Sequence, residues 1–224
     1  MRMNSERIKL SVVLLLFFSF LLLSSIHSSA QSDKKAKDLL DKLSNKTKGL
    51  KSYKVQFTFV LNNRDQNINQ TKDGILTVKG NKYHLKFDGQ EIFCDGQNIY
   101  TYMKASNEAQ IQSSDDLDEE SITPEKIFTI YEKGFKFRLN EEDKSMGSSI
   151  KVVDLYPLEP KKKDYSIIRL YIDEGKLMVQ KALIRGKNGS DYTYNIKSME
   201  NNPEVIDAYF VFDKAKYPGV KIIK

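Results

Sequence analysis

Short turn signals divide most of this sequence into segments in which apolar and polar residues alternate. The signals are Asp88-Gly89, Asp95-Gly96, Asp173-Glu174-Gly175 and Asn188-Gly189. Gly, Asn and Asp tolerate the backbone conformations of tight hairpins, so turns of this composition typically join antiparallel strands. The sequence therefore predicts a large antiparallel sheet in which most strands pair with their neighbours along the chain.

About ten strands are expected. In the first, Val55, Phe57, Phe59 and Leu61 alternate with polar residues, which is typical of a strand with one buried face. Some strands carry apolar residues on both faces, an excess that is compatible with a ligand cavity and equally with ordinary packing of helices against the sheet. The remaining predicted strands are Gly74–Lys79, Lys82–Phe87, Glu91–Cys94, Ile99–Met103, Ser149–Tyr156, Tyr165–Ile172, Lys176–Ile184, Asp191–Ser198 and Tyr209–Asp213.

Two segments have the periodicity of helices instead. Residues 34–50 carry one apolar face and end at the stop signal Gly49; the face comprises Ala36, Leu39, Leu40, Leu43 and Thr47. Further along, Thr123-Pro124 is a helix start signal and Gly134 an end signal; the apolar residues between them are Ile127, Phe128, Ile130 and Tyr131. The predicted fold class is α+β, mainly antiparallel β, with a curved sheet covered by an N-terminal helix and a mid-chain helix.

The first thirty residues have the features of an export signal. A positively charged start is followed by an uncharged run from Leu10 to Ile26, and Ser28-Ser29-Ala30 places small residues before Gln31. The run could just span a bilayer, but the small residues and the polar segment that follows favour cleavage. We expect cleavage of residues 1–30, which leaves residues 31–224 as a single soluble domain.

Composition leaves little material for catalysis. The chain has two His and one Cys, and one His lies in the expected signal, so there are too few ligands for a zinc or iron–sulfur site. If Asp88-Gly89 is a two-residue turn, Tyr83 pairs with Cys94, and His84 lies on the opposite face of the hairpin. We therefore expect Cys94 to be a buried hydrophobic residue, His84 to be a surface residue, and the two to form no catalytic pair.

No other spacing singles out catalytic residues, metal ligands or a cofactor site. The acidic run of residues 115–120 lacks the central Gly and the alternating ligands of a calcium loop, so it is interpreted as a solvated linker. The protein is therefore expected not to be an enzyme. An exported hydrolase remains an alternative, but it would need a pair of carboxylates and hydroxyls that no spacing identifies.

The formal net charge of +6 falls to about +4 without the signal, which carries three basic residues and one acidic residue. A basic protein can attract nucleic acid, but an exported one has little access to it, so no nucleic-acid partner is expected. Two lysine clusters, Lys34-Lys35-Lys37 and Lys161-Lys162-Lys163, could dock on an acidic protein or an anionic lipid. Alternatively, they are solvated termini and hairpin tips.

A colinear series of short motifs resembles the LolA-type periplasmic lipoprotein carriers, as a divergent branch. The motifs are Leu43-Ser44-Asn45 at a helix end, Tyr53-Lys54-Val55-Gln56-Phe57-Thr58, Gly74-Ile75-Leu76-Thr77-Val78-Lys79, Glu91-Ile92-Phe93-Cys94-Asp95-Gly96, Ile99-Tyr100-Thr101-Tyr102, Thr123-Pro124, the closing strand Phe210-Val211-Phe212, and Pro218-Gly219-Val220. Each motif is short, but their order matches the family across most of residues 31–224.

The resemblance implies an incomplete β-barrel, or half-barrel, whose apolar concave face is lidded by helices. It implies a periplasmic chaperone of a Gram-negative bacterium, which binds the acyl chains of lipoproteins and carries them from the inner to the outer membrane without a cofactor. The implied partners are acylated lipoproteins, an inner-membrane lipoprotein-releasing transporter and an outer-membrane acceptor, with the carrier as a monomer. The alternative is a periplasmic regulatory domain that senses lipoproteins or lipids and binds a partner protein.

The expected lining of the acyl-chain cavity is Phe57, Phe59, Leu76, Val78, Tyr83, Leu85, Phe87, Ile92, Ile127, Phe128 and Tyr131. The proteobacterial carriers have an Arg just after the Val-Lys strand, and it ties the lid shut. This chain has Gly80 at the matching position, between Lys79 and Lys82. The resemblance therefore implies the cavity but not this way of closing it, and it assigns the role of the Arg to neither Lys.

Overall fold

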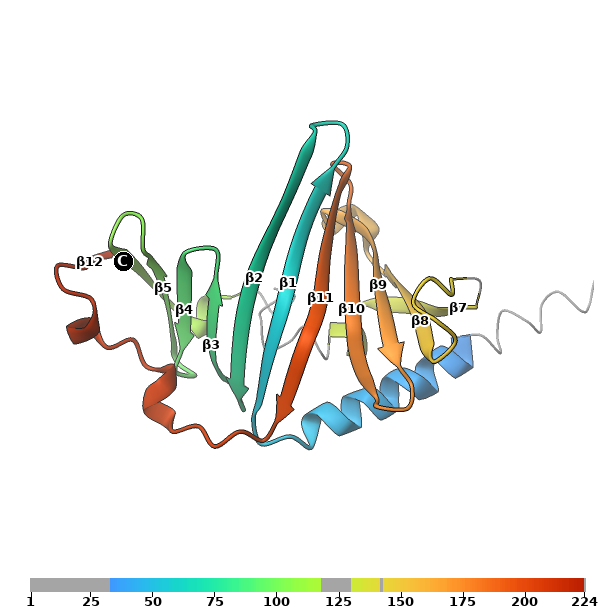
Figure 1. Cartoon of the computed structure of the whole chain (residues 1–224), viewed down its shortest axis with the longest axis horizontal. Coiled ribbons are helices and arrows are strands. Elements are labelled where there is room, and N and C mark those ends of the chain that lie inside the picture. The colour runs from blue at the N-terminus through green and yellow to red at the C-terminus, as the bar shows by residue number, and fades with distance from the viewer. Residues whose placement is uncertain (1–32, 118–129, 142, 224) are drawn as a thin grey trace, which may run out of the picture.

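One curved sheet of twelve strands dominates the computed structural model, which describes residues 33–117, 130–141 and 143–223 (Figure 1). The strands are β1 (Tyr53–Asn63), β2 (Ile68–Lys79), β3 (Lys82–Phe87), β4 (Gln90–Cys94), β5 (Asn98–Met103), β6 (Glu108–Ser113), β7 (Phe135–Asn140), β8 (Ile150–Pro157), β9 (Tyr165–Asp173), β10 (Met178–Gly186), β11 (Ser190–Asn201) and β12 (Lys221–Ile223). Their order across the sheet is β12-β6-β5-β4-β3-β2-β1-β11-β10-β9-β8-β7. Within the described ranges the two end strands, β12 and β7, do not pair, so the sheet stays unclosed.

The sheet consists of two antiparallel meanders that meet at its centre. Strands β1 to β6 form one meander, and β7 to β11 form the other. Although β1 and β11 are far apart in the sequence, they pair along their whole length, from Tyr53 opposite Asn201 to Asn63 opposite Ser190. Only β12 departs from antiparallel pairing within this sheet, because it runs parallel to β6. The prediction of a curved, incomplete and mainly antiparallel barrel is confirmed.

The β3–β4 hairpin has the turn and the register that the sequence predicts. Asp88 and Gly89 both have positive φ angles, 52° and 75°, as a two-residue hairpin turn of this composition requires. Tyr83 pairs with Cys94, and His84 projects to the other face of the hairpin. Cys94 is buried, as expected.

The predicted strand Tyr209–Asp213 is wrong, and so is the expected closing strand within it. These residues belong to an irregular segment with two short 3-10 helices, η5 (Asp207–Phe210) and η6 (Lys214–Lys216). Phe210 and Phe212 are buried while Val211 is exposed, so the segment alternates like a strand without forming one. Conversely, the sequence analysis did not predict β6, β7 and β12.

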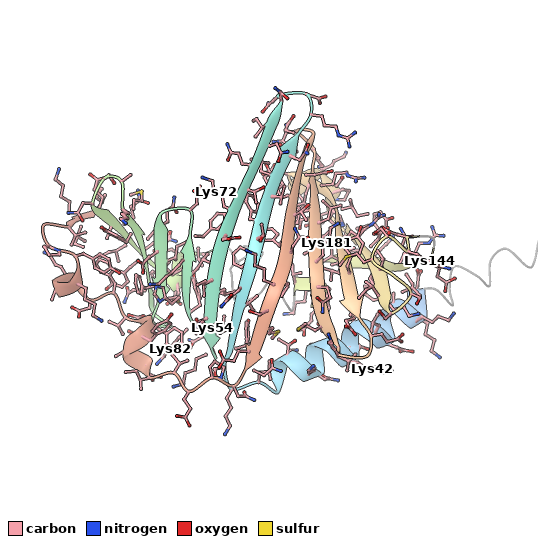
Figure 2. All side chains as sticks on the ribbon, in the orientation of Figure 1. Lys42, Lys54, Lys72, Lys82, Lys144 and Lys181 are labelled. Atoms are coloured by element: carbon pink, nitrogen blue, oxygen red, sulfur yellow. The ribbon has the colours of Figure 1, made fainter. Side chains whose placement is uncertain are left out.

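We call residues 202–220 the C-terminal strap, because they run from the end of β11 to β12 at the far edge of the sheet (Figure 1). Two lysines hold the strap near the β2–β3 turn. Lys79 Nζ donates hydrogen bonds to the Val205 carbonyl oxygen at 2.9 Å and to the Asp207 carboxylate at 2.7 Å. Lys82 Nζ donates to the other carboxylate oxygen of Asp207 at 2.7 Å, and Figure 2 shows Lys82 beside η5.

The N-terminal helix, residues 33–48, packs its apolar face into the main core. Ala36, Leu39, Leu40 and Leu43 are buried there, as predicted from their spacing. The helix lies along the lower ends of the strands of the second meander in Figure 1. No helix in the described part of the chain is long and apolar enough to cross a membrane.

Most of the predicted mid-chain helix lies outside the described residues, including its start at Thr123-Pro124. The described end is a short 3-10 helix, η3 (Ile130–Glu132). Glu132 accepts hydrogen bonds from Lys48 Nζ at 2.8 Å and from Ser44 Oγ, which attach η3 to the N-terminal helix. Tyr131 is buried at this junction, and its burial raises the pKa of its hydroxyl.

Candidate functional site

The concave face of the sheet carries continuous apolar rows across the strands. Cross-strand register aligns Val55, Leu76, Leu85 and Ile92 in one row from β1 to β4. Because side chains alternate between the faces of a strand, residues two positions further along form the next row on the same face. The half-barrel interior is therefore apolar from strand to strand.

Burial of the apolar side chains on this face decreases from the end near the N-terminal helix as far as Leu61, and Asn63 at the end of β1 is buried again, with a hydrogen bond to Ser190. On β1, Tyr53 and Val55 are buried, whereas Phe59 and Leu61 are only partly buried. The buried side chains of the N-terminal helix belong to the same core cluster as Tyr53 and Val55. Hydrophobic surface that stays partly exposed is the surface on which a ligand can bind.

Five aromatic residues gather on the concave face, of which Phe57 is buried and the other four are partly buried. We call them the aromatic cluster: Phe57, Phe59, Phe87, Tyr192 and Tyr194. Phe59 lies at the centre, with ring centroids 5.3 Å from Phe87, 5.2 Å from Tyr194 and 6.3 Å from Tyr192. Phe57 lies 6.0 Å from Phe87 and 5.9 Å from Tyr194. The cluster brings together β1, β3 and β11, so it exists only because the two meanders pair.

Gly74 on β2 makes room for the cluster. It lies opposite Phe57 on one side and Phe87 on the other. A Cβ atom at Gly74 would lie 2.3 Å from the Phe57 ring, far inside van der Waals contact. The Phe57 ring therefore lies flat across the strand at the one position that has no side chain.

The surroundings of the cluster disfavour charge at its centre. Burial raises the pKa of the Tyr194 hydroxyl, and the neighbouring Tyr192 adds to the shift, so Tyr194 stays neutral. A charged residue, Lys72, lies opposite Phe59 on the neighbouring strand β2. Its Nζ pairs with Asp88 at 2.7 Å. The centre of the cluster is apolar, and the Lys72 charge at its edge is neutralised by Asp88, so the cluster favours a hydrocarbon chain over a polar ligand.

The predicted lining residues fall into three groups in the structure. Phe57, Leu76, Val78, Tyr83 and Tyr131 are buried members of the main core. Phe59, Leu85, Phe87 and Ile92 are partly buried and pack against that core, so they remain available to a ligand. Ile127 and Phe128 lie outside the described residues.

Tyr192 and Tyr194 are the members of the cluster that sequence reasoning missed. Both lie on the predicted strand Asp191–Ser198, but the sequence does not show that this strand pairs with β1. Pairing of Tyr194 with Phe59 and of Tyr192 with Leu61 places them in the cluster. The available signal was the alternation Tyr192, Tyr194, Ile196, which matches the period of Phe57, Phe59 and Leu61.

A separate depression of about 330 Å³ opens at the tips of the β3–β4 and β5–β6 hairpins. It shares Gly74 and Phe87 with the concave face. The rest of its lining is mostly polar or charged: Asp73, Ile75, Lys86, Asp88, Gly89, Gln90, Glu91, Tyr102 and Lys104. An acyl chain there would desolvate charged groups, so the aromatic cluster is the better candidate for an acyl-chain site.

The expectation that His84 lies at the surface is wrong, because the C-terminal strap covers it. His84 is 4% exposed, with its ring 4.0 Å from Phe93 and 4.9 Å from Tyr209 of the strap. Burial lowers the pKa of the His84 imidazole, and a hydrogen bond from Nε2 to Glu91 at 3.0 Å opposes that shift. Cys94 projects from the other face of this hairpin, so no Cys–His pair forms.

Two further positions that the sequence singled out can be placed in part: residues 118–120 of the acidic run lie outside the described residues, and Gly80 lies in a turn. Within the described ranges, no three His, Cys, Asp or Glu side chains gather as metal ligands. Gly80 has a φ angle of 60° and forms the β2–β3 turn, where a left-handed residue is needed. The flanking Lys79 and Lys82 bind Asp207 and so hold the C-terminal strap.

Comparison with known proteins identifies a family and a fold. The family described as outer membrane lipoprotein carrier protein LolA matches residues 48–213, well over half of the chain. An uncharacterized conserved protein from Thermus thermophilus is 9% identical, with a TM-score of 0.53 over 86% of this chain and 98% of that chain. A DUF1329 family protein from Desulfovibrio piger is 13% identical, with a TM-score of 0.50 over 83% of this chain and 99% of that chain.

A LolA superfamily protein from Nitrosomonas europaea is 14% identical, with a TM-score of 0.43 over 79% of this chain and 97% of that chain. Comparison with curated proteins gives no match. At identities this low, the structural likeness to the Thermus and Desulfovibrio proteins supports the fold alone.

Proposed function

This chain belongs to the LolA family of outer membrane lipoprotein carrier proteins, and from that premise we propose that it binds the acyl chains of lipoproteins at the aromatic cluster and carries them between membranes. The observation that carries the proposal is the gradient of burial along the concave face. Phe59, Phe87, Tyr192 and Tyr194 form an apolar surface that the protein itself covers only in part.

The energetics of the task suit such a surface. Burial of one CH₂ group contributes about 0.8 kcal/mol, so a chain of roughly 16 carbons favours an apolar environment by on the order of 12 kcal/mol. A carrier has to match much of this gain and still release its cargo without chemistry. Aromatic rings that are already partly covered supply apolar contact without a large loss of conformational freedom, because few of their torsions remain free.

The location and the partners belong to the same proposal. Residues 1–30 act as a cleaved export signal, and the protein works in the periplasm of a Gram-negative bacterium. It receives acylated lipoproteins from an inner-membrane transporter and delivers them to an outer-membrane acceptor, as a monomer. It catalyses no reaction and needs no cofactor, since its work is the binding and release of a hydrocarbon chain.

Phe59→Gln tests the proposal most directly. It places an amide at the centre of the aromatic cluster, where an acyl chain would have to desolvate it. We expect binding of an acylated lipoprotein to weaken at least tenfold, which corresponds to about 1.4 kcal/mol. The matched control is Val60→Gln, on the same strand but on the outer face, which should leave binding within a factor of two.

The unacylated form of the same lipoprotein is the second control. Wild-type protein should retain only the acylated form. Equal retention of both forms would exclude the carrier function and favour the alternative, a regulatory domain that recognises a partner protein through its polypeptide. A cooperative thermal unfolding transition of Phe59→Gln that begins above the temperature of the binding assay would show that lost binding is not lost folding.

A further inference from the structure

A second surface combines exposed apolar residues with a cluster of lysines, and we call it the basic patch: Tyr156, Leu158, Lys161, Lys162, Lys163 and Lys187. Leu158 is 55% exposed and Tyr156 is 42% exposed, so two large apolar side chains are exposed close together in the sequence. The three consecutive lysines follow in the β8–β9 loop, in and after the 3-10 helix η4 (Pro160–Lys162).

Hydrogen bonds fix this loop between two other parts of the chain. The amide of Leu158 donates to the Gly134 carbonyl oxygen at 2.9 Å, just before β7. The amide of Lys187, in the β10–β11 turn, donates to the Asp164 carbonyl oxygen at 2.8 Å. Lys187 Nζ also donates to the carbonyl oxygen of Pro160. The apolar residues and the lysines are therefore held together in one place.

The patch is strongly positive. Lys133 and Lys136 flank it, and Lys136 lies directly opposite Tyr156 on β7. Against these six lysines stand three nearby carboxylates, Glu132, Glu159 and Asp164, so three positive charges are in excess. Glu159 is also paired with Lys162 at 3.0 Å.

The patch lies at the end of the sheet where β1 ends, and its Tyr156 lies on the outer face, because the preceding Leu155 is buried in the main core. Pro157 ends β8 and Tyr165 begins β9, and Tyr165 pairs with Gly186 at the end of β10. On the neighbouring strands, Ser190 pairs with Asn63 at the end of β1. By this pairing, the patch lies at the end of the sheet where β1 ends and β11 begins, near the top of Figure 1.

We propose that the basic patch docks the protein on an anionic lipid bilayer, with Leu158 and Tyr156 entering the interface and the lysines contacting lipid headgroups. Interfacial binding combines buried apolar area with attraction to anionic lipids, and Tyr favours the boundary between water and hydrocarbon. An acidic protein would complement the lysines, but it gives no reason for a Leu side chain to be exposed beside them at the end of β8. Docking in this orientation brings the open end of the aromatic cluster toward the lipid surface.

Vesicle binding tests the proposal, with a chain that begins at Gln31 and so contains every described residue. We expect binding to vesicles that contain an anionic phospholipid to be at least tenfold stronger than binding to neutral phosphatidylcholine vesicles. Raising the salt from about 0.1 M to about 0.5 M should weaken it strongly, because screening shortens the reach of the lysines. Equal binding to both kinds of vesicle, or to neither, overturns the proposal.

Two matched sets of variants locate the contact. Lys161→Gln/Lys162→Gln/Lys163→Gln should weaken binding to anionic vesicles at least tenfold. Lys34→Gln/Lys35→Gln/Lys37→Gln, which makes the same change in net charge on the N-terminal helix, should weaken it by less than threefold. An equal loss of vesicle binding in the two triple variants would show that only the overall charge of the protein attracts it to the vesicles, and it would contradict a specific patch. If the protein bound immobilised polyglutamate through the same three lysines but did not bind vesicles, the partner of the patch would be an acidic protein and the membrane proposal would be overturned.

The absence of Trp from the chain allows a direct test of insertion. Leu158→Trp introduces a single fluorophore into the patch, and its emission should shift to the blue on anionic vesicles and be quenched by brominated lipid. Ile206→Trp, at a position on the strap that is 74% exposed, is the control and should show neither change. An unshifted Leu158→Trp spectrum on bound protein would overturn insertion. These readouts need no acyl-chain binding, so their failure is distinct from a failure of the proposed carrier function.

Discussion

Two aromatic clusters lie on opposite faces of the same sheet, and they differ in what covers them. On the outer face of β4 and β5, the strap places Phe212 on Tyr100 with ring centroids 5.4 Å apart and on its own Tyr217 at 4.9 Å. On the concave face, Phe59 lies among rings at similar distances but stays partly exposed. The strap buries Phe93 and Phe212 and leaves Tyr100 and Tyr217 partly covered, whereas on the concave face only Phe57 of the five cluster rings is buried.

The difference shows that an excess of aromatic residues does not by itself indicate a ligand site. Ring-to-ring distances are alike in both clusters, so they do not distinguish packing from binding. What distinguishes the clusters is whether a segment of the same chain has already displaced water from the rings. The following predictions test this distinction, in order of decreasing expected effect.

Phe212→Ala should have the largest effect on stability. Loss of a buried aromatic side chain costs about 3–5 kcal/mol, because the transfer free energy is lost and a cavity remains. Phe59→Ala removes a partly exposed ring and should cost roughly half as much. Urea unfolding of both variants measures the two losses. If the order were reversed, the concave cluster would be the sealed core and the strap a removable cover.

Gly74→Ala should have an intermediate effect. The new methyl group would lie 2.3 Å from the Phe57 ring, so the ring has to move and the aromatic cluster with it. Overpacking of this kind costs about 1–3 kcal/mol, and acyl-chain binding should weaken as well. Gly175→Ala is the control, because its methyl group would lie 3.5 Å from the nearest atom, Asp173 Oδ1. Unchanged binding by Gly74→Ala would mean that Phe57 has no part in the site.

Attachment of the strap should depend on pH through Asp207. Hydrogen bonds from Lys79 and Lys82 lower the pKa of the Asp207 carboxyl to about 2. Because the folded pKa lies below the unfolded one, this attachment is complete above about pH 4 and is lost as the pH falls toward 2. Hydrogen exchange of the strap amides should therefore speed up over this range. In Asp207→Asn the hydrogen exchange of the strap amides should be faster at neutral pH and should lack this pH dependence. If the substitution left these exchange rates unchanged, the aromatic contacts alone would hold the strap.

His84 should add a smaller pH dependence at higher pH. Burial lowers its pKa, so the unfolded chain binds a proton more readily than the folded one. The contribution to stability is therefore present above the unfolded pKa, near 6.5, and is lost as the pH falls below it. His84→Phe keeps a ring against Phe93 and Tyr209 and should remove this dependence between pH 7 and 5. An identical pH profile for both proteins in urea unfolding would show that Glu91 compensates the charge fully.

Local features of the fold could be predicted because they depend on residues close together in the sequence. The turn at Asp88-Gly89 sets its own register, so the faces of Tyr83, His84 and Cys94 follow by counting. The buried face of the N-terminal helix follows from its spacing in the same way. Alternation alone was misleading at Phe210 and Phe212, because an irregular segment can bury every second residue as a strand does.

The sequence by itself therefore determined most of the hairpins, the N-terminal helix and the apolar faces of the predicted strands. Only the tertiary structure decided which of those faces remain open, because that depends on contacts between distant segments. The pairing of β1 with β11 brings Tyr192 and Tyr194 to Phe59, and the passage of the strap across the sheet buries His84 and Phe93. Neither contact leaves a local signal, since each depends on the free energy gained when two apolar surfaces from distant parts of the chain exclude water together.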